Sequence, residues 1–289
     1  MGPVVLRHRR LEVEVDPRGA RLTRLLLDGE NMVRDQYPYA GAVCGRFANR
    51  IGGSRFALDG QEVPVTPGRE GGAHLHGGDE GFDQRLWTVE QRSDQMVELS
   101  YTSADGEEGY PGEMRVSVTY SIQSPAKLVI WYHATTTKAT VVNLTSHCYF
   151  NLCEAEDSIE NHRLQVFADA YTPVDEHLIP TGEIRHVRGS EMDLLLEPQL
   201  LSEKLWLDHN FVLNNGETCA AELTCGNKTL IVRTSEPGLQ VYAGAKGGVC
   251  LETQHFPDSP NHANFPSTTL RPGQSFSSWT KYIFSIKDQ

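Results

Sequence analysis

The amino-acid sequence predicts an all-β fold, a large antiparallel β-sandwich or barrel built as one domain over residues 1–289. Three observations lead to this prediction. Apolar and polar residues alternate with a period of two in many short segments, turn dipeptides separate these segments, and helical periodicity is nearly absent. A chain of this length is common for a single all-β domain and can bury a sizeable core.

The predicted strands follow one another along the whole chain. Residues 11–15, 97–102, 114–122, 128–134, 163–168, 230–234 and 279–284 alternate, most clearly between Met114 and Ile122. A turn at Ser124-Pro125 joins two of these strands, and further turns are predicted at Asp28-Gly29, Asp59-Gly60, Asp105-Gly106, Asn215-Gly216 and Pro272-Gly273. Only residues 191–205 carry a helical pattern, and it is weak.

The charge balance excludes several classes of function. Lys and Arg number 26 against 38 Asp and Glu, which gives a formal net charge of -12. Nucleic acids and anionic membranes are bound by basic surfaces, so neither is expected as a partner. The N-terminal residues contain no apolar signal core, and no apolar run approaches the length of a membrane helix. These features favour a soluble cytoplasmic protein.

The cysteines show no metal-binding or redox spacing. No Cys-x-x-Cys pair occurs among them, so we expect buried free thiols in a reducing cytosol; they are Cys44, Cys148, Cys153, Cys219, Cys225 and Cys250.

The segment 251–261, which reads Leu-Glu-Thr-Gln-His-Phe-Pro-Asp-Ser-Pro-Asn, places the carboxylate of Glu252 after an apolar lead-in. Desolvation disfavours the charged form of a carboxyl group, which is how a glutamate becomes a useful general base. Taken alone, Glu252 is more simply a structural residue. It becomes a catalytic candidate only together with partners elsewhere in the chain.

Four other segments place polar residues beside predicted strands: 45–52, 74–83, 143–152 and 208–211. An arginine in the first could donate two hydrogen bonds to a hydroxylated ligand, or it could cap a turn. A histidine lies among apolar and aromatic neighbours in the third. For any single histidine here, a structural role is the simpler interpretation.

The pair His74 and His76 also allows a metal interpretation. With Gly68 and Glu80 it forms most of a cupin metal motif, but Trp87 occupies the place of the closing glycine. A second cupin motif is missing as well. Because metal sites need a complete ligand set, we expect no metal.

Taken together and in order, the segments 45–51, 75–78, 143–152, 208–211 and 251–261 resemble the aldose 1-epimerase, or galactose mutarotase, family. Supporting matches lie at 81–83 with Trp87, 105–112, 171–175 and 270–273, so the resemblance extends from about residue 11 to 284. Each motif alone is weak, whereas five in order with compatible spacing are specific. The resemblance implies the large antiparallel supersandwich of the galactose mutarotase type.

The resemblance also implies roles for individual residues. Glu252 matches the catalytic base of the family and His147 its catalytic acid. Positions that contact the sugar are matched by Asn49, Arg50, His76, Tyr149, Asp208 and Gln240. The implied reaction interconverts the α and β anomers of free hexoses such as glucose or galactose, and it needs no cofactor.

Acid–base chemistry explains these residue types. Opening the sugar ring requires a proton to leave the C1 hydroxyl and another to reach the ring oxygen, and a carboxylate with an imidazole supplies both transfers. Hydrogen bonds to the remaining hydroxyls hold the sugar while its C1 end turns. The sequence has no dinucleotide fingerprint or P-loop, which agrees with a reaction that is neither redox nor phosphoryl transfer.

Two departures from the family pattern bear on substrate preference. Trp206 stands where the family usually has glycine, and the segment after Gln240 lacks an asparagine and an insertion. The N-terminal part is also shorter than in typical members. We expect these changes to open the rim of the cleft and to affect the choice of sugar more than catalysis.

Other functions stay open at this point. An epimerase of a phosphorylated or otherwise modified sugar would need basic residues at the cleft, and Arg46 with Arg50 is the only evident pair. A non-catalytic sugar-binding protein on the same fold is the alternative from another class, although binding alone needs no acid and base. For the catalytic interpretation the expected partner is a monosaccharide, and the expected assembly is a monomer or homodimer.

Overall fold

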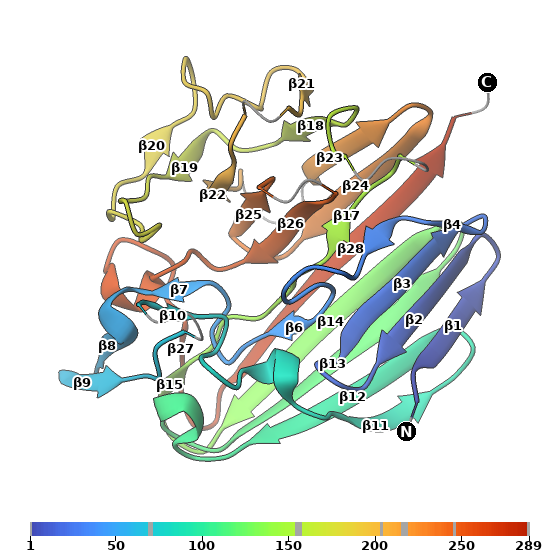
Figure 1. Ribbon diagram of the computed structural model, residues 1–289. Coiled ribbons are helices and arrows are strands. Elements are labelled where there is room, and N and C mark those ends of the chain that lie inside the picture. Colours follow the sequence, from blue (N-terminus) through green and yellow to red (C-terminus); the bar gives the residue numbers. More distant parts are fainter. Residues whose placement is uncertain are drawn as a thin grey trace.

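The structure is a computed structural model that describes residues 2–68, 72–153, 158–202, 205–214, 219–244 and 247–287. Its largest element is a nine-stranded antiparallel sheet (Figure 1). In spatial order its strands are β11 (Thr88–Arg92), β12 (Met96–Ser103), β13 (Met114–Gln123), β14 (Lys127–Thr136), β28 (Ser275–Ile286), β24 (Lys228–Thr234), β23 (Cys219–Cys225), β18 (Arg163–Val166) and β21 (Gln199–Leu200).

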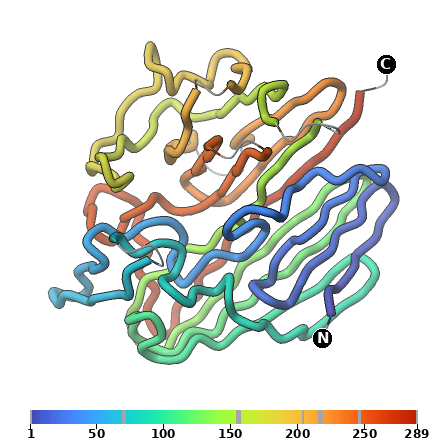
Figure 2. Tube along the Cα trace, viewed as in Figure 1, coloured from blue at the N-terminus to red at the C-terminus, as the bar shows by residue number. Residues whose placement is uncertain are grey.

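Two smaller antiparallel sheets lie over one face of this large sheet (Figures 1 and 2). The first contains β1 (Val4–His8), β2 (Leu11–Asp16), β3 (Arg21–Leu27) and β4 (Glu30–Asn31). The second contains β20 (Arg185–His186), β19 (Ala170–Thr172), β22 (Asp208–Val212), β25 (Gly238–Tyr242), β26 (Val249–Gln254), β17 (Tyr149–Phe150) and β5 (Val33–Arg34).

Short two-stranded sheets complete the fold beside the second covering sheet. They pair β6 (Val43–Cys44) with β16 (Thr145–Ser146), β7 (Arg50–Ile51) with β10 (His74–Leu75), β8 (Arg55–Leu58) with β9 (Gln61–Pro64), and β15 (Thr140–Val141) with β27 (Thr269–Leu270). Four 3-10 turns are described, at Gly52–Ser54, Phe82–Gln84, Glu107–Gly109 and Ser259–Asn261. No α-helix occurs in the described ranges, and none of their helices is long and apolar enough to cross a membrane.

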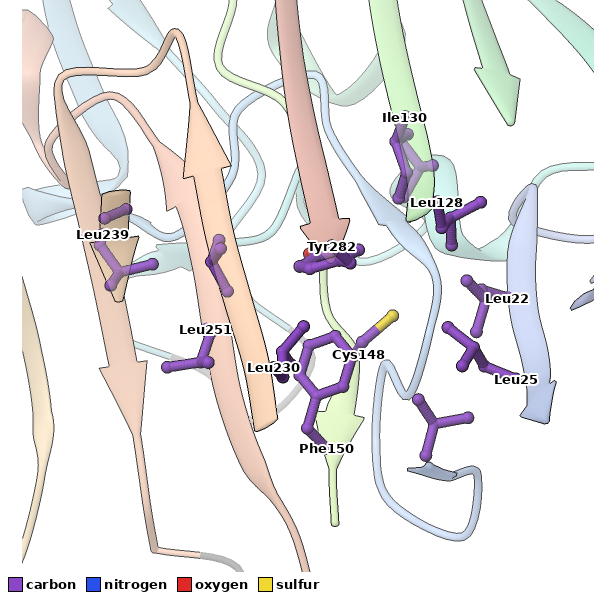
Figure 3. Close-up of a cluster of buried hydrophobic side chains, with 14 of the residues drawn as sticks. Leu22, Leu25, Leu128, Ile130, Cys148, Phe150, Leu230, Leu239, Leu251 and Tyr282 are labelled. Carbon is purple, nitrogen blue, oxygen red and sulfur yellow. The ribbon is translucent and has the colours of Figure 1, made fainter. Parts of the chain in front are cut away.

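The core fills the space between the large sheet and its two covering sheets (Figure 3). Leu22 and Leu25 of β3 pack in one cluster with Leu128 and Ile130 of β14. The same cluster continues below the second covering sheet, where it includes Leu230, Leu239, Leu251 and Tyr282. Burial of apolar surface therefore holds both covering sheets against the large sheet.

The predicted antiparallel β-sandwich is confirmed, and the period-two pattern is its local cause. Along β13 the residues from Met114 to Ile122 alternate between buried and less buried, as the sequence predicts. Two of the predicted turns are two-residue hairpins in which both residues have positive φ, the geometry for which Asp-Gly is favoured. They are Asp28-Gly29, with φ of 51° and 92°, and Asp59-Gly60, with φ of 52° and 76°.

Two sequence predictions fail in the described part of the chain, and one lies outside it. The helix predicted at 191–205 is absent from the described residues of that segment, where Leu194 and Leu201 enter the core while Leu196 and Leu200 stay exposed. Residues 203–204 of that segment and the turn at Asn215-Gly216 lie outside the described residues.

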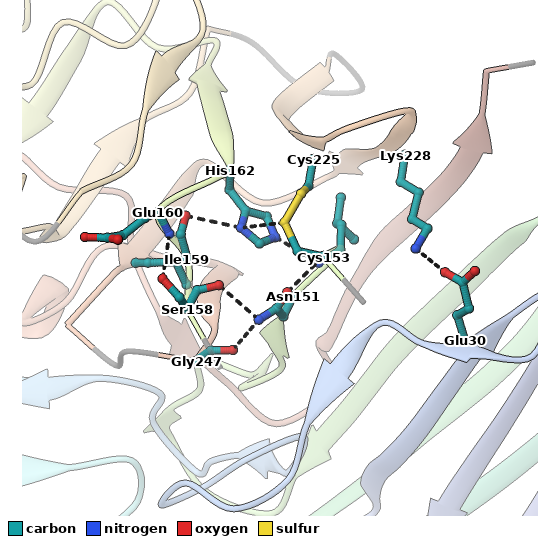
Figure 4. The surroundings of a disulfide bond; sticks show 11 residues. Glu30, Asn151, Cys153, Ser158, Ile159, Glu160, His162, Cys225, Lys228 and Gly247 are labelled. Carbon is teal, nitrogen blue, oxygen red and sulfur yellow. Dashed lines mark hydrogen bonds and ion pairs between the residues drawn. A yellow bond between two sulfur atoms is a disulfide. The ribbon is translucent and has the colours of Figure 1, made fainter. Parts of the chain in front are cut away.

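The expectation of six free thiols is wrong for one pair. Cys153 and Cys225 form a disulfide across a sequence separation of 72 residues (Figure 4). Cys153 follows β17 and Cys225 ends β23, so the bond joins the second covering sheet to the large sheet. This pairing arises from the packing of the sheets, which no sequence spacing encodes. Cys44, Cys148, Cys219 and Cys250 take no part in a disulfide, as predicted, and all of them but Cys219 are buried.

Candidate active site

Three neighbouring strands of the second covering sheet carry a row of polar residues. Glu252 on β26 lies opposite Gln240 on β25, and Gln240 lies opposite Asn210 on β22. Asp208 precedes Asn210 by two residues and Cys250 precedes Glu252 by two. Because side chains on a strand alternate between its faces, these residues share one face of the sheet.

Glu252 is a buried carboxylate beside a histidine. Its Oε1 lies 3.6 Å from Nε2 of His147, and its side chain is 2% exposed. Its Oε2 has no hydrogen-bond partner within the described ranges. Burial raises the pKa of Glu252 well above its ordinary value, and the charge of Asp208 raises it further while Arg50 lowers it.

His147 lies in the link between β16 and β17, where both of its backbone polar groups are paired. Its N–H donates to the carbonyl of Ala42 at 3.0 Å, and its carbonyl accepts from Gly41 at 2.8 Å. The rings of Tyr39 and Tyr149 stack on the imidazole at centroid distances of 5.9 and 5.0 Å. The ring plane is therefore held by two aromatic neighbours.

The ionisation of His147 complements that of Glu252. Burial lowers the pKa of His147 to about 4, while burial raises that of Glu252. Both shifts favour the uncharged state in which the pair shares one exchangeable proton, and the two groups titrate as a coupled pair. Such a pair can take up one proton and release another without changing its net charge.

His76 lies next to His147, with the ring centroids 5.1 Å apart and the rings edge to face. Its Nδ1 accepts a hydrogen bond from the backbone N–H of Asn49 at 3.1 Å. In the neutral ring the proton therefore lies on Nε2. The backbone of His76 also donates to the carbonyl of Asn49, so the segments 45–51 and 75–78 are bound to each other.

The close approach of the segments 45–51 and 75–78 requires a glycine at position 77. Its φ is +95°, and a Cβ at this position would lie 1.7 Å from the carbonyl oxygen of Gly45. Any side chain would push the two segments apart and move His76 out of the cleft.

Asp208 and Gln240 form a hydrogen-bonded pair beside Glu252. Nε2 of Gln240 donates to Oδ1 of Asp208 at 2.6 Å. Burial raises the pKa of Asp208, and the charge of Arg50 lowers it. Arg50 comes from β7 and is fixed by pairing of that strand with β10, opposite Leu75.

These residues surround one cavity of about 700 Å³. It is lined by Tyr37, Pro38, Tyr39, Asn49, Arg50, Leu75, His76, His147, Tyr149, Asp208, Tyr242, Gly244 and Glu252. Every site residue predicted from the sequence is in this set except Gln240, which contacts the cavity wall through Asp208. The volume is typical of a small-molecule site.

Sequence reasoning missed the aromatic wall of the cavity. Tyr37, Tyr39 and Tyr242 all line it. The only signal for the first two was the turn-like run Tyr37-Pro38-Tyr39, which carries no chemistry of its own. Their role becomes visible once the fold brings Tyr39 onto His147 and Tyr37 onto Tyr149, with a centroid distance of 4.9 Å.

Other polar residues of the same motifs are structural. Arg46 is 2% exposed and donates to the backbone carbonyls of Pro111, Gly112, Ser103 and Ala104. It therefore holds the loop that contains these carbonyls and is not among the residues that line the cavity. Trp206, at the position where the family usually has glycine, is 51% exposed and meets His209 edge to face.

The cupin-like pair does not form one site. His74 is fully buried, with Nδ1 2.5 Å from the carbonyl of Thr66 and Nε2 2.5 Å from the hydroxyl of Tyr110. It faces a small core, whereas His76 faces the cavity. The ligand atoms of His76, His147 and Glu252 do lie within 4.8 Å of one another, close enough for one cation.

A second cluster of possible ligand atoms contains Cys153, Cys225 and His162. Its two sulfur atoms are bonded to each other. Nε2 of His162 accepts from the backbone N–H of Leu152 at 2.8 Å, so its Nδ1 carries the proton beside the sulfur of Cys153 (Figure 4).

Comparison with known proteins agrees with this geometry. The profile of the family described as aldose 1-epimerase matches residues 3–283. A galactose mutarotase from Homo sapiens is 40% identical over 304 residues, covering 95% of this chain and 87% of that protein. An aldose 1-epimerase from Escherichia coli K12 is 36% identical, covering 87% and 81%.

Solved structures agree as well. An aldose epimerase homologue from C. elegans has a TM-score of 0.93 at 27% identity, covering 99% of each chain. A galactose 1-epimerase from Lactobacillus acidophilus has a TM-score of 0.87 at 27% identity, covering 99% of this chain and 95% of that one.

Proposed function

The chain belongs to the aldose 1-epimerase family, and on this premise we propose that it is an isomerase that interconverts the α and β anomers of free hexoses such as glucose or galactose. The observation that carries the proposal is the buried pair of Glu252 and His147, 3.6 Å apart, on the wall of a cavity large enough for a small molecule. The names of the relatives support galactose and related sugars as substrates.

The proton pair accounts for ring opening. In the reactive state its shared proton lies on His147, which leaves Glu252 as a carboxylate. Glu252 takes the proton of the C1 hydroxyl while His147 gives its proton to the ring oxygen, and the bond between C1 and the ring oxygen breaks. The products on the enzyme are the open-chain aldehyde, a protonated Glu252 and a neutral His147.

Ring closure reverses both transfers after rotation about the C1–C2 bond. The hydroxyl on C5 attacks the other face of the aldehyde, and His147 takes its proton. Glu252 returns its proton to the oxygen on C1. The pair ends with the charge and the proton with which it began, so the cycle needs no cofactor or metal.

The remaining polar residues hold the sugar. We assign Asp208, Arg50 and Asn49 to its hydroxyl groups, and Gln240 to Asp208, whose orientation it fixes. His76 presents its Nε2 proton towards the cavity, and Tyr149 supplies an aromatic wall. Hydrogen bonds of this kind keep the rest of the sugar in place while C1 turns.

We also propose that residues 1–289 form one catalytic domain, because the cavity draws residues from Tyr37 to Glu252. The partner is a monosaccharide, without nucleic acid or membrane, and the assembly is a monomer or homodimer. The proposed location is the cytoplasm.

Polarimetry of freshly dissolved α-D-glucose and α-D-galactose tests this proposal. The purified protein should accelerate the approach to the equilibrium rotation over the spontaneous rate. Glucose 6-phosphate, assayed beside them, should be a poorer substrate, because the described cavity wall offers Arg50 as its one Lys or Arg side chain. Tight binding of both hexoses without acceleration would instead establish a sugar-binding protein.

A further inference from the structure

The two nitrogens of His147 have different neighbours. Nε2 faces Glu252 at the cavity, as described above, and Nδ1 lies 3.6 Å from the sulfur of Cys250. Cys250 and Glu252 are two residues apart on β26, so their side chains share a face. A single strand therefore supplies the partner of each nitrogen.

Stacking alone cannot define the catalytic nitrogen. Tyr39 and Tyr149 fix the plane of the imidazole. A half-turn about the Cβ–Cγ bond keeps that plane and exchanges ring carbons for ring nitrogens, and moving the proton from Nε2 to Nδ1 changes no contact of the ring faces. Only a hydrogen-bonding partner at the ring edge distinguishes these states.

Cys250 is suited to this task. It is 0% exposed, and burial raises the pKa of its thiol well above the ordinary value, so the sulfur keeps its proton. A thiol is a weak donor and a weak acceptor. Its sulfur can accept from Nδ1–H of the protonated ring, and it can accept from the same Nδ1–H after the ring has given away its Nε2 proton.

We propose that Cys250 is a positioning residue that holds the retained proton of His147 on Nδ1, so that Nε2, which faces the sugar and Glu252, is the nitrogen that gives and takes protons. The proposal rests on the proposed function above and adds a residue to its machinery. By holding Nδ1 in both protonation states, the thiol lets His147 give and take protons at Nε2 without leaving a buried Nδ1 unpaired.

The charged and titratable groups around His147 define what else acts on its ring. They are Glu252 and Cys250 from β26, Tyr149 from β17, and His76, Tyr39 and Arg21 from the neighbouring segments. Among the contacts described for the ring, Cys250 provides the one that another side chain makes to Nδ1.

Two substitutions separate hydrogen bonding from packing. Cys250→Ser keeps a small group that donates and accepts, whereas Cys250→Ala removes it. Cys148→Ala is the matched control, because Cys148 is an equally buried thiol that points into the core (Figure 3) and contacts Ser146. The variants are compared by kcat and KM for α-D-glucose, and by the ¹⁵N chemical shifts of the His147 ring.

We expect Cys250→Ala to lower kcat about tenfold with little change in KM, the size of effect for one lost hydrogen bond. Its neutral His147 should show an increased Nε2–H population. Cys250→Ser should restore kcat to within about threefold of the native protein and restore the Nδ1–H signature, and Cys148→Ala should retain both.

Equal kcat and equal ¹⁵N shifts in Cys250→Ala and Cys148→Ala would overturn the proposal. A Cys250→Ser variant as impaired as Cys250→Ala would also overturn it, because volume and not hydrogen bonding would then be decisive. If the native protein does not equilibrate glucose, the proposed function fails, and the ¹⁵N comparison still decides the role of Cys250.

Discussion

Removal of the Cys153–Cys225 disulfide should lower the free energy of unfolding by about 4 kcal/mol. The bond closes a loop with a sequence separation of 72 residues. In the chain-entropy treatment, such a crosslink removes about 15 cal/mol/K from the unfolded ensemble, which is about 4 kcal/mol at 25 °C. With an unfolding entropy of about 2.1 cal/mol/K per residue, 289 residues give a drop in Tm of about 7 °C.

Urea unfolding measures this difference directly. The double variant Cys153→Ser/Cys225→Ser should unfold at the same lower urea concentration as the native protein in dithiothreitol. Cys219→Ser is the control, because Cys219 is a half-buried free cysteine on the same strand as Cys225, and its loss should leave the midpoint unchanged. In urea without reductant, the native protein should present four reactive thiols.

Two results together would refute the reasoning. Dithiothreitol would leave the urea midpoint unchanged, and all six cysteines of the chain would react as thiols in urea. That result would mean that the two sulfurs lie close without being bonded. A midpoint that falls equally in the Cys219→Ser variant would attribute the loss to strand β23 and not to the crosslink.

Three further predictions concern the site and its support. The value of kcat/KM should fall below about pH 4, where His147 and Glu252 are both protonated and no base remains. It should also fall once the pH rises past the raised pKa of Glu252, where no acid remains; an acid limb centred near pH 6.5, the ordinary imidazole value, would contradict the account of burial. Dialysis against EDTA should leave the rate of glucose mutarotation unchanged, whereas a loss that Zn²⁺ restores would place a metal on the ligand atoms of His76, His147 and Glu252. Arg46→Met should lower the free energy of unfolding by about 3 kcal/mol, because it leaves several buried carbonyls without donors; thermal melting followed by circular dichroism measures this, and an unchanged Tm would show that water replaces the guanidinium.

The strands could be predicted from the sequence because their signal is local. Alternation from Met114 to Ile122 needs only a sheet with one buried face, and Asp-Gly pairs need only positive φ at both turn residues. The helix at 191–205 failed for the opposite reason. Its weak helical pattern is overridden by tertiary packing, which buries Leu194 and Leu201 but leaves Leu196 exposed on a bend.

Only part of the site could be predicted from the sequence, and that prediction rests on the family resemblance. Glu252 and His147 are separated by more than a hundred residues in the sequence, and no periodicity joins them. The contact of Cys250 with Nδ1 of His147 and the stacking of Tyr39 depend on how β26, β17 and the 37–39 turn pack together. Such contacts have no motif of their own, and the same holds for the Cys153–Cys225 bond.

The central claim is that Glu252 moves the proton of the C1 hydroxyl, and Glu252→Gln tests it most directly. The amide keeps the shape of the side chain and removes its basicity. Polarimetry of α-D-glucose should show a rate lowered by at least about 100-fold relative to the native protein, while sugar binding, measured by calorimetry on the same sample, stays within a few-fold. Full activity in this variant would contradict the assignment of Glu252 as the base.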